Sequence, residues 1–422
     1  MAIDRRKLLL YAAAAALRFL LFLAFPRLPD LLTGRAEIST PVTSFKRLQE
    51  GLFLYTHNVS PYDGGVFYQA PLLLPLFALV PPFIFPLATA VLYIFTDLVC
   101  AESLIQIAES GVARTSRLFS SPRKDNHWDS LAVGAAFLFN PFTIATCLAR
   151  PTSVFSNGAI LYAIANAVDR KPAKSMLALA LAAYLSLYPA LLLPPLILLC
   201  HDQIVAKDGS KPKLPRSSFE LSSIFCGSVA WFLAMSYLLT GQSWEFLRST
   251  YGVHLLLPDL TPNVGLWWYF FIEMFDSFRE FFLGVFWLHL MGYVGGLCFR
   301  LRTQPLFVLT TIIGILAIFQ PYPSIADASL YFALLPLYNH VFSLMRYTFF
   351  AMATILYAAL LGPAFYYLWI YAGSGNANFF YAITLVWSLG LSIIVGECLF
   401  AVLRDEWEVE RPEMKGKEVR RI

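Results

Sequence analysis

Two carboxamide residues, Asn376 and Asn378, interrupt the apolar sequence near the end of this 422-residue chain, and Phe379, Phe380 and Tyr381 follow them directly. A carboxamide both donates and accepts hydrogen bonds, and the glycines and asparagines of the phrase "AGSGNANFFYA" reverse a chain easily. A minimal turn needs only a few such residues. Hydrogen-bonding groups beside an aromatic shelf therefore indicate a turn that can also contact a ligand with polar and apolar parts.

A second polar turn lies in the phrase "PDLTPNVGLWWYFFIEMF", where Asp259, Thr261 and Asn263 precede an aromatic block that begins near Trp267. Apolar residues of the block recur at spacings of three and four, which predicts a helix with one apolar face. Tryptophan and tyrosine favour the boundary between lipid tails and water. We expect either a simple interfacial anchor or a lipid-facing wall whose polar rim receives a lipid headgroup or a partner's luminal domain.

Residues that could break covalent bonds are not grouped for that chemistry. The six cysteines are scattered, almost all within apolar segments, and form no CxxC pair, so the sequence predicts neither a disulfide framework nor a zinc site. No Cys and His pair, Ser and His pair or metal-ligand cluster falls on the predicted luminal side. We therefore predict that the chain has no cofactor and no metal.

The composition indicates a membrane protein whose elements are all helical. The chain is 58% apolar and 14% charged, whereas soluble domains have roughly 25% charged residues. Apolar runs such as 347–372 and 379–403 are long enough to cross a bilayer as helices. They lack the alternating polarity of a transmembrane barrel. The small net charge of +4 reflects topology, and no nucleic-acid partner is expected.

Basic clusters divide the chain into about twelve predicted spans with both termini cytosolic, because basic residues concentrate in cytosolic loops. We expect one membrane domain over 1–422, with a first luminal loop and short luminal-leaflet helix over 26–85, a luminal loop and interfacial helix over 241–278, and a cytosolic tail over 404–422. The predicted helices lie near 8–25, 86–107, 129–148, 155–169, 174–187, 189–201, 219–240, 278–299, 305–320, 327–345, 348–371 and 379–403.

Several ionisable residues fall within the predicted spans, and each is costly there unless it is paired or faces a water-filled cavity. We expect most of them to pair between helices, because their scattered positions do not form a proton or ion relay. These residues are Arg18, Asp97, Glu102, His289, His340 and Glu397.

The first luminal loop ends in a Ser-Pro-Tyr turn and a proline-led apolar segment, and it resembles the C-type membrane glycosyltransferases that use polyprenyl-phosphate sugars. That resemblance implies a similar helix arrangement. Such enzymes need a carboxylate pair near the start of the loop, but this chain has Glu37 without a partner acid and Asp63 alone in "PYDGG". The same loop carries a possible glycosylation acceptor at Asn58, within Asn58-Val59-Ser60.

Long phrases in a fixed order show a closer resemblance. "SPYDGGVF", "LSLYP", "PDLTPNVGLWWYFFIEMF", "PYPSIADASLY" and "LWIYAGSGNANFFYAITL" resemble the U subunit (PIG-U) family of the glycosylphosphatidylinositol (GPI) transamidase, from about residue 35 to 404. The resemblance implies a non-catalytic, multi-pass endoplasmic reticulum subunit that binds and presents the GPI lipid. It further implies partner subunits, among them the cysteine-protease-like subunit that carries out the transfer.

The resemblance makes the Asn-rich turn a candidate headgroup clamp; the simpler alternative is a hairpin that packs on a partner subunit. Asn376 and Asn378 would face phosphate or sugar hydroxyls, and the aromatic residues Phe379, Phe380 and Tyr381 would face lipid. One alternative is a polyprenyl-phosphate-dependent mannosyltransferase of the endoplasmic reticulum membrane, which the missing acid pair disfavours. A second alternative is a lipid transporter, for which the sequence shows no intramembrane relay.

Overall fold

The computed structural model describes residues 5–208 and 214–417, and over this part of the chain the regular elements are helices. A single β-bridge joins Thr115 to Ser120. The predicted all-α class is therefore confirmed. Bilayer hydrocarbon offers no water to backbone N–H and C=O groups, and a helix satisfies them within one segment.

Seven helical segments of the described residues are long and apolar enough to cross a membrane. The predicted count of about twelve spans stays a prediction, because the remaining apolar helices are shorter. The seven segments are α1 (Arg5–Ala24), η1 with α5 (Pro82–Ile84 and Phe85–Ser110), η2 with α10 (Tyr188–Leu192 and Leu193–Asp208), α11 (Leu214–Leu239), α15 (Asp276–Arg300), α18 (Thr348–Ile370) and α19 (Ala377–Glu410).

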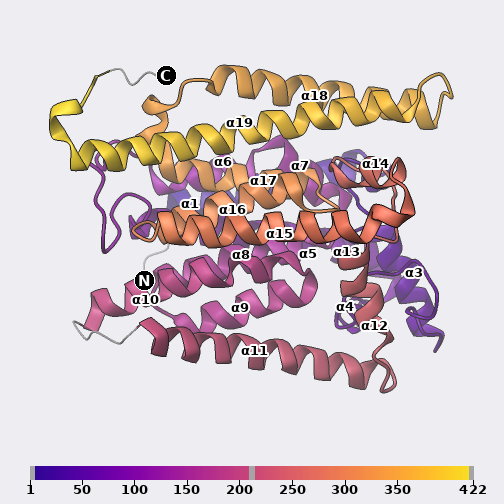
Figure 1. Cartoon of the computed structure of the whole chain (residues 1–422). Coiled ribbons are helices and arrows are strands. Elements are labelled where there is room, and N and C mark those ends of the chain that lie inside the picture. The colour runs from indigo at the N-terminus through magenta and orange to yellow at the C-terminus, as the bar shows by residue number, and fades with distance from the viewer. Residues whose placement is uncertain (1–4, 209–213, 418–422) are drawn as a thin grey trace.

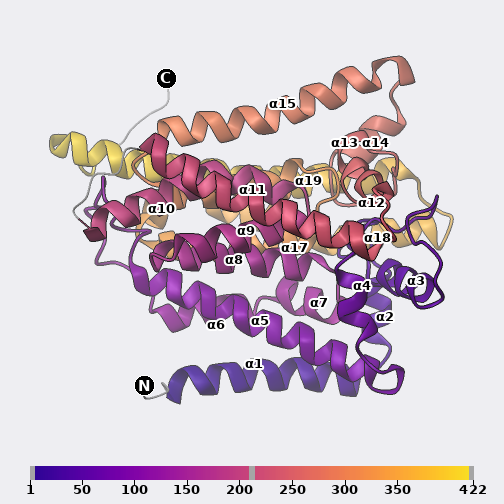
Figure 2. The ribbon, with the colours of Figure 1, turned by 90° about the horizontal axis from the view of Figure 1, so that it is seen from below.

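Shorter apolar helices fill the interior of the bundle. Nearly every residue of α8, α16 and α17 is buried, whereas α1, α11, α15 and α18 present most of their residues outward. Figures 1 and 2 show α18 with α19 on one side of the bundle, α11 on the opposite side, and α1 and α15 on the two remaining flanks. The interior helices are α8 (Ser153–Val168), α9 (Pro172–Leu185), α16 (Pro305–Phe319) and α17 (Ile325–Leu334), the last continuing as η4 (Leu335–Leu344).

Helices α6 (Ser130–Leu138) and α7 (Pro141–Ala149) form a broken pair that bends by 52°. An Asn-Pro pair, Asn140 and Pro141, lies at this bend. Asn140 Oδ1 accepts a hydrogen bond of 2.9 Å from the backbone N–H of Phe142, and Pro141 occupies the first helical position, where its missing N–H is tolerated. Taken together, the pair is apolar enough to be an eighth span.

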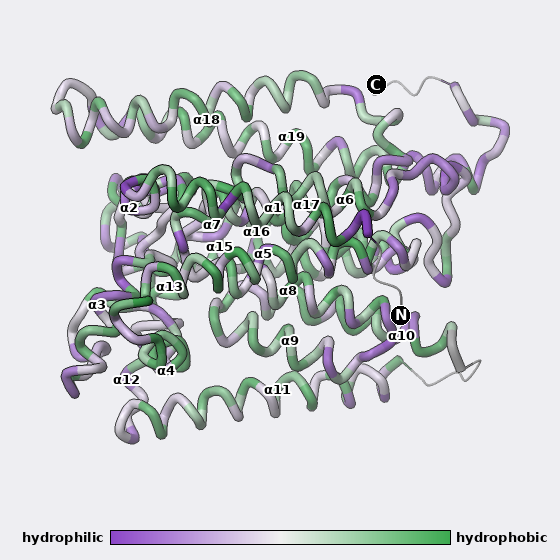
Figure 3. Tube along the Cα trace, turned by 180° about the vertical axis from the view of Figure 1, so that it is seen from behind, coloured by the Kyte–Doolittle hydropathy of each residue, from purple (hydrophilic) through white to green (hydrophobic). Residues whose placement is uncertain are grey.

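Polar segments gather at the two ends of the bundle (Figure 3). Helix α1 begins and α19 ends at the same end, here called the terminal end, and the opposite end is called the far end (Figure 1). The terminal residues themselves, and residues 418–422 of the predicted tail, lie outside the described residues. Short elements cap the far end: α2 (Leu28–Thr33), α3 (Phe45–Thr56), α4 (Leu73–Ala78), α12 (Glu245–Leu247), η3 (Arg248–Gly252), α13 (Val253–Leu256) and α14 (Trp267–Ile272).

The segment predicted to be a cytosolic tail is helical at its start. Helix α19 continues past Arg404 to Glu410, and a short turn, η5 (Pro412–Met414), follows it. Asp405, Glu406 and Glu408 are buried. Since Arg123 from the 111–129 loop pairs with Asp405 and Glu408, charge pairing rather than an apolar sequence fixes this last part of the helix.

Four of the six ionisable residues predicted to lie within the spans have polar partners on other elements: Arg18, Asp97, Glu102 and Glu397. His289 instead contacts the rings of Tyr293 and Phe319, and the buried His340 Nδ1 has no hydrogen-bond partner. Arg18 of α1 and Asp97 of α5 form a buried ion pair with Nε and Oδ2 2.8 Å apart. Glu102 accepts hydrogen bonds from Lys7 and from the Tyr11 hydroxyl. Helix α1 is thereby attached to α5 by three side-chain contacts within an otherwise apolar interface.

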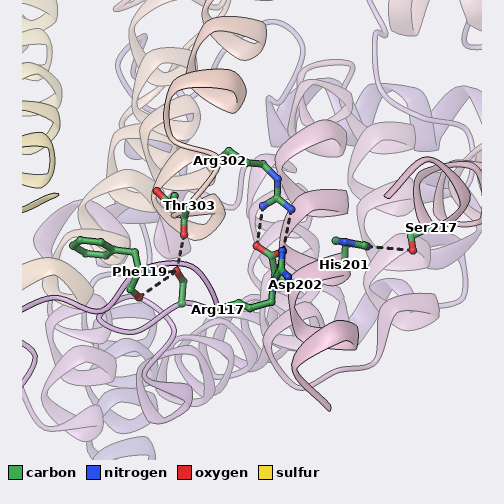
Figure 4. A network of polar contacts seen from close by, with 8 residues as sticks. Arg117, Phe119, His201, Asp202, Ser217, Arg302 and Thr303 are labelled. Atoms are coloured by element: carbon green, nitrogen blue, oxygen red, sulfur yellow. Dashed lines mark hydrogen bonds and ion pairs between the residues drawn. The ribbon is translucent and has the colours of Figure 1, made fainter. Parts of the chain in front are cut away.

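A polar network at the terminal end joins four separate segments (Figure 4). The buried Asp202 carboxylate of α10 accepts two hydrogen bonds from Arg302, of 2.8 and 3.0 Å, and one of 3.1 Å from Arg117. Beside it, His201 Nδ1 lies 3.2 Å from Ser217 Oγ of α11. The network ties α10 to α11, to the 111–129 loop and to the link between α15 and α16.

Helices α18 and α19 approach closely because a glycine lies at their crossing. A Cβ atom added to Gly390 would lie 2.7 Å from Ile355 Cγ1 and 3.3 Å from the Ile355 backbone nitrogen. Small residues at such crossings allow two helix backbones to meet within a membrane.

We predict that Gly390→Leu separates this hairpin and lowers stability by about 1–3 kcal/mol, the usual penalty for overpacking. The measurement is the thermal midpoint of the purified protein in detergent. Gly396→Leu is the matched control, because an added Cβ on Gly396 meets no atom within 4 Å. Equal losses in both variants would show that the close crossing is not the cause.

Candidate functional site

The Asn-rich turn joins α18 to α19 at the far end of the bundle. Gly373 adopts a positive φ of 63°, and the backbone N–H groups of Ser374 and Gly375 donate to the Leu368 carbonyl at 3.0 and 3.1 Å. Asn376 is the N-cap of α19, and its Oδ1 accepts from the Phe379 N–H at 3.3 Å. One predicted ligand contact is therefore also a helix cap, a role that asparagine fills well.

Asn378 connects this turn to α14. Its Oδ1 accepts a hydrogen bond from the Tyr269 hydroxyl. The ring of Tyr269 stacks on that of Tyr381 with centroids 4.5 Å apart, and the Tyr381 hydroxyl donates to the Leu266 carbonyl at 3.1 Å. The two predicted polar segments, more than a hundred residues apart in sequence, thus meet at one place.

The three predicted aromatic residues have different surroundings. Phe379 is 54% exposed, whereas Phe380 is fully buried and Tyr381 is half-buried. Trp268 of α14 stacks on Trp369 of α18 and also packs on Phe380. Phe379 is thus the aromatic residue best placed to contact lipid, while Phe380 and Tyr381 hold α14 against the hairpin.

Asp259, Thr261 and Asn263 form a hydrogen-bonded turn beside α14. Asp259 Oδ1 accepts from the Thr261 N–H at 2.9 Å, and Asn263 Oδ1 accepts from the Gly265 N–H at 2.7 Å. Asn263 is fully buried, while Thr261 is exposed. Burial and the nearby Asp259 carboxylate raise the pKa of Tyr322, so its hydroxyl stays protonated and donates to the Asp259 carbonyl at 2.6 Å.

Trp267 is 1% exposed and lies within the protein rather than at its lipid surface. Its ring stacks on Phe286 of α15, with centroids 4.8 Å apart, and meets Trp287 edge-on. The sequence predicted one interfacial helix through this block. The structure instead ends α14 at Ile272 and begins α15 at Asp276, because a corner between the helices lets both faces of the aromatic block pack.

A cavity of about 600 Å³ opens beside the hairpin, between α18 with α19 and the segment 31–38. Its walls are mainly apolar. Phe380 lines it, whereas the other eight predicted contact residues do not. The full lining is Leu31, Leu32, Arg35, Glu37, Ile38, Phe142, Val264, Ile325, Ala358, Ala359, Leu360, Gly362, Pro363, Ala364, Tyr367, Phe380, Ile383, Thr384 and Trp387.

One wall of the cavity carries an ion pair. Arg35 Nη2 lies 3.2 Å from Glu37 Oε1, and the guanidinium lies 5.9 Å from the centre of the Tyr366 ring. The Glu37 carbonyl accepts from the Ile325 N–H at 3.0 Å, which anchors this segment to the start of α17. The arrangement places a guanidinium, paired with a carboxylate, beside an apolar slot.

The opposite wall belongs to α18, which packs chiefly against α19. Pro363 lies within this helix and lines the cavity. A proline within a helix removes the hydrogen bond to the residue four positions earlier, here Ala359, which lines the same cavity. On the last wall, the buried Trp387 Nε1 has no hydrogen-bond partner. Acceptor and donor groups are therefore both available inside a mostly apolar space.

Neither Arg35 nor most of the cavity wall was predicted from the sequence. The Gly-Pro pair within the apolar run of α18 was the available signal, because a proline interrupts helix hydrogen bonding. The pairing of α18 with the segment 31–38 had no signal in the sequence, because more than three hundred residues separate the two.

Of the residues considered for catalysis and modification, Glu37 lines the cavity, whereas Asp63 and Asn58 do not. Glu37 is paired with Arg35, and Asp63 is exposed in the turn that ends at Gly65. Asn58 follows α3 with a positive φ of 57° and is exposed, so its side chain is accessible. Within residues 5–208 and 214–417, no three His, Cys, Asp or Glu side chains form a group that could hold a metal ion.

Comparison with known proteins adds to this geometry. A family model described as "GPI transamidase subunit PIG-U" matches residues 12–387. The chain is 34% identical over 398 residues to the human GPI-anchor transamidase component PIGU, with 90% of each chain covered. It is 33% identical to the GPI transamidase component GAB1 of Saccharomyces cerevisiae, with 95% of this chain and 96% of the yeast protein covered. The chain therefore belongs to the PIG-U family of GPI transamidase subunits, because the family model matches most of it and these relatives align with it over nearly their whole length.

Proposed function

We propose that this chain is a non-catalytic subunit of the GPI-anchor transamidase in the endoplasmic reticulum membrane, where it binds the GPI lipid and presents it for transfer. The observation that carries the proposal is the apolar cavity of about 600 Å³ beside the α18–α19 hairpin. Its volume is within the roughly 300–1,000 Å³ typical of ligand sites. Transfer itself is assigned to the cysteine-protease-like subunit of the complex.

The lipid would use two kinds of surface at the far end. Its acyl chains would lie against α18 and α19, and its phosphoglycan would lie near Arg35 and the polar turns. Non-helical backbone at membrane depth is tolerated where it lines a cavity or is buried in protein. The α18–α19 turn satisfies that requirement through Asn376 and through the contact between Asn378 and Tyr269.

The proposal includes a topology. It comprises about twelve spans in a glycosyltransferase-C-like helix arrangement, with both termini in the cytosol. The far end would then lie in the lumen, where GPI is attached. The start of α1 and the end of α19 at one end of the bundle support an even number of crossings (Figure 1). The short elements of 26–85 and 241–278 would then form a luminal cap that contacts the other subunits, so that the chain also acts as a scaffold.

Filling the cavity should block lipid capture. We predict that Ala359→Trp lowers the amount of GPI retained by the purified complex by roughly tenfold or more, equivalent to about 1.4 kcal/mol of binding free energy. Mass spectrometry of co-purified lipid and surface display of a GPI-anchored reporter are the measurements.

Ala353→Trp is the matched control for this experiment, because Ala353 lies on the same helix, is exposed and does not line the cavity. Both variants must assemble with the other subunits. Normal GPI retention by an assembled Ala359→Trp complex would exclude the cavity as the lipid site.

The asparagines of the hairpin turn can be separated into structural and ligand roles. We predict that Asn378→Leu reduces GPI capture. Tyr269→Phe removes the hydroxyl that donates to Asn378 Oδ1, and we expect this variant to capture nearly the original amount of GPI. Asn376→Ser should keep the helix cap and still weaken capture through the lost carboxamide. Equal effects of Asn378→Leu and Tyr269→Phe would instead show that the bond between the two side chains, and not a lipid contact, is what matters.

Glycosylation of Asn58 tests the proposed topology. An exposed acceptor on the luminal side is accessible to the glycosylation machinery, so we expect a glycosidase-sensitive mobility shift that Asn58→Gln abolishes. A sequon engineered into the 111–129 loop, at the terminal end, should stay unmodified. Modification of that loop would reverse the proposed orientation.

A further inference from the structure

A second cavity, of about 570 Å³, lies at the terminal end, where α19 leaves the bundle and α18 begins. It is separate from the GPI site proposed above. Four basic residues line it, Arg123, Arg346, Arg404 and Lys417, together with one acidic residue, Glu408. The charge balance of the lining residues is therefore strongly positive.

Arg404 is the most deeply placed of the four cations. It is buried, and its Nε donates to Glu408 Oε1 at 2.8 Å while Nη2 donates to the carbonyls of Met414 and Lys417. Its remaining nitrogen, Nη1, is buried without a hydrogen-bond partner. A buried guanidinium donor without an acceptor is costly, so an acceptor supplied by a ligand would be stabilising.

The acidic side chain in the cavity is already occupied. Glu408 accepts hydrogen bonds from both Arg123 and Arg404. Arg123 also donates to Asp405, which does not line the cavity. These contacts orient Arg123 and Arg404. The other two basic residues of the lining, Lys417 and Arg346, are exposed.

Apolar residues complete the cavity and indicate a ligand at the membrane boundary. The Arg346 guanidinium lies 4.5 Å from the centre of the Phe400 ring, and Leu344 and Met345 form part of the wall. Tyr347, Phe349 and Phe350 follow at the start of α18 and are exposed, as side chains that contact lipid would be. A phosphate joined to acyl chains fits both the cationic base and the apolar border.

We infer that this cavity binds the phosphate of an anionic phospholipid headgroup in the leaflet at the terminal end, the cytosolic leaflet in the proposed topology. Basic residues beside membrane spans attract anionic lipid through charge. Guanidinium groups add charge-assisted hydrogen bonds to phosphate oxygens. A free phosphate ion shares this chemistry, and the experiment below distinguishes the two sources.

The test uses the purified full-length chain in nanodiscs made of phosphatidylcholine alone or of phosphatidylcholine with phosphatidylinositol 4-phosphate. Native mass spectrometry counts the retained lipid, and thermal unfolding measures stabilisation by the lipid or by inorganic phosphate. The cavity variant is Arg346→Gln with Lys417→Gln. The matched control is Arg411→Gln with Lys415→Gln, which removes the same charge from exposed residues of the same end that do not line the cavity.

We expect retention of the anionic lipid to fall roughly tenfold in the cavity variant, as the loss of charged hydrogen-bond donors implies, and to stay near the original level in the control. Retention should also weaken as salt rises. Equal losses in both double variants, or equal retention of the two lipids, would overturn the proposal. Stabilisation by inorganic phosphate as large as that by the lipid would assign the cavity to a soluble anion instead.

Discussion

Water is absent from the hydrocarbon core of a bilayer, and this constraint governs the whole molecule. Every backbone N–H and C=O group at that depth needs a partner within the protein, so the chain forms helices along its length and confines irregular backbone to the two ends. Breaks that remain inside the bundle have their own solutions. Asn140 caps the start of α7, at the break between α6 and α7. Ser324 and Asp327 form a capping box at the start of α17.

The same constraint explains how charge is distributed. Arg18 and Asp97 are tolerated within the bundle because they pair with each other at 2.8 Å. Larger groups of charge lie at the terminal end, where Asp202 joins Arg117 and Arg302 (Figure 4) and where Arg404 extends the charged part of α19. A chain with few charged residues therefore uses them mainly to fasten helices and loops to one another.

The candidate GPI site depends on the way α18 is held. Gly390 brings α18 close to α19, and the aromatic contacts of Trp268 hold α14 across the end of the hairpin. Because α18 packs chiefly against α19, its other side is free to form a cavity wall opposite Arg35. Because the chain belongs to the PIG-U family, this geometry belongs to a membrane subunit of the GPI transamidase, an enzyme complex that handles a lipid with a large polar head.

The amino-acid sequence by itself determined the membrane class, the helical elements and the polar turns, because these follow from local runs of apolar residues and from Gly, Asn and Pro. It also determined the family, through long phrases in a fixed order. The tertiary structure decided that Asn378 meets Tyr269, that Trp267 is buried against α15, and that Arg35 lies across a cavity from α18. These contacts join residues tens to hundreds of positions apart, and they arise from side-chain packing between helices, which local periodicity does not encode.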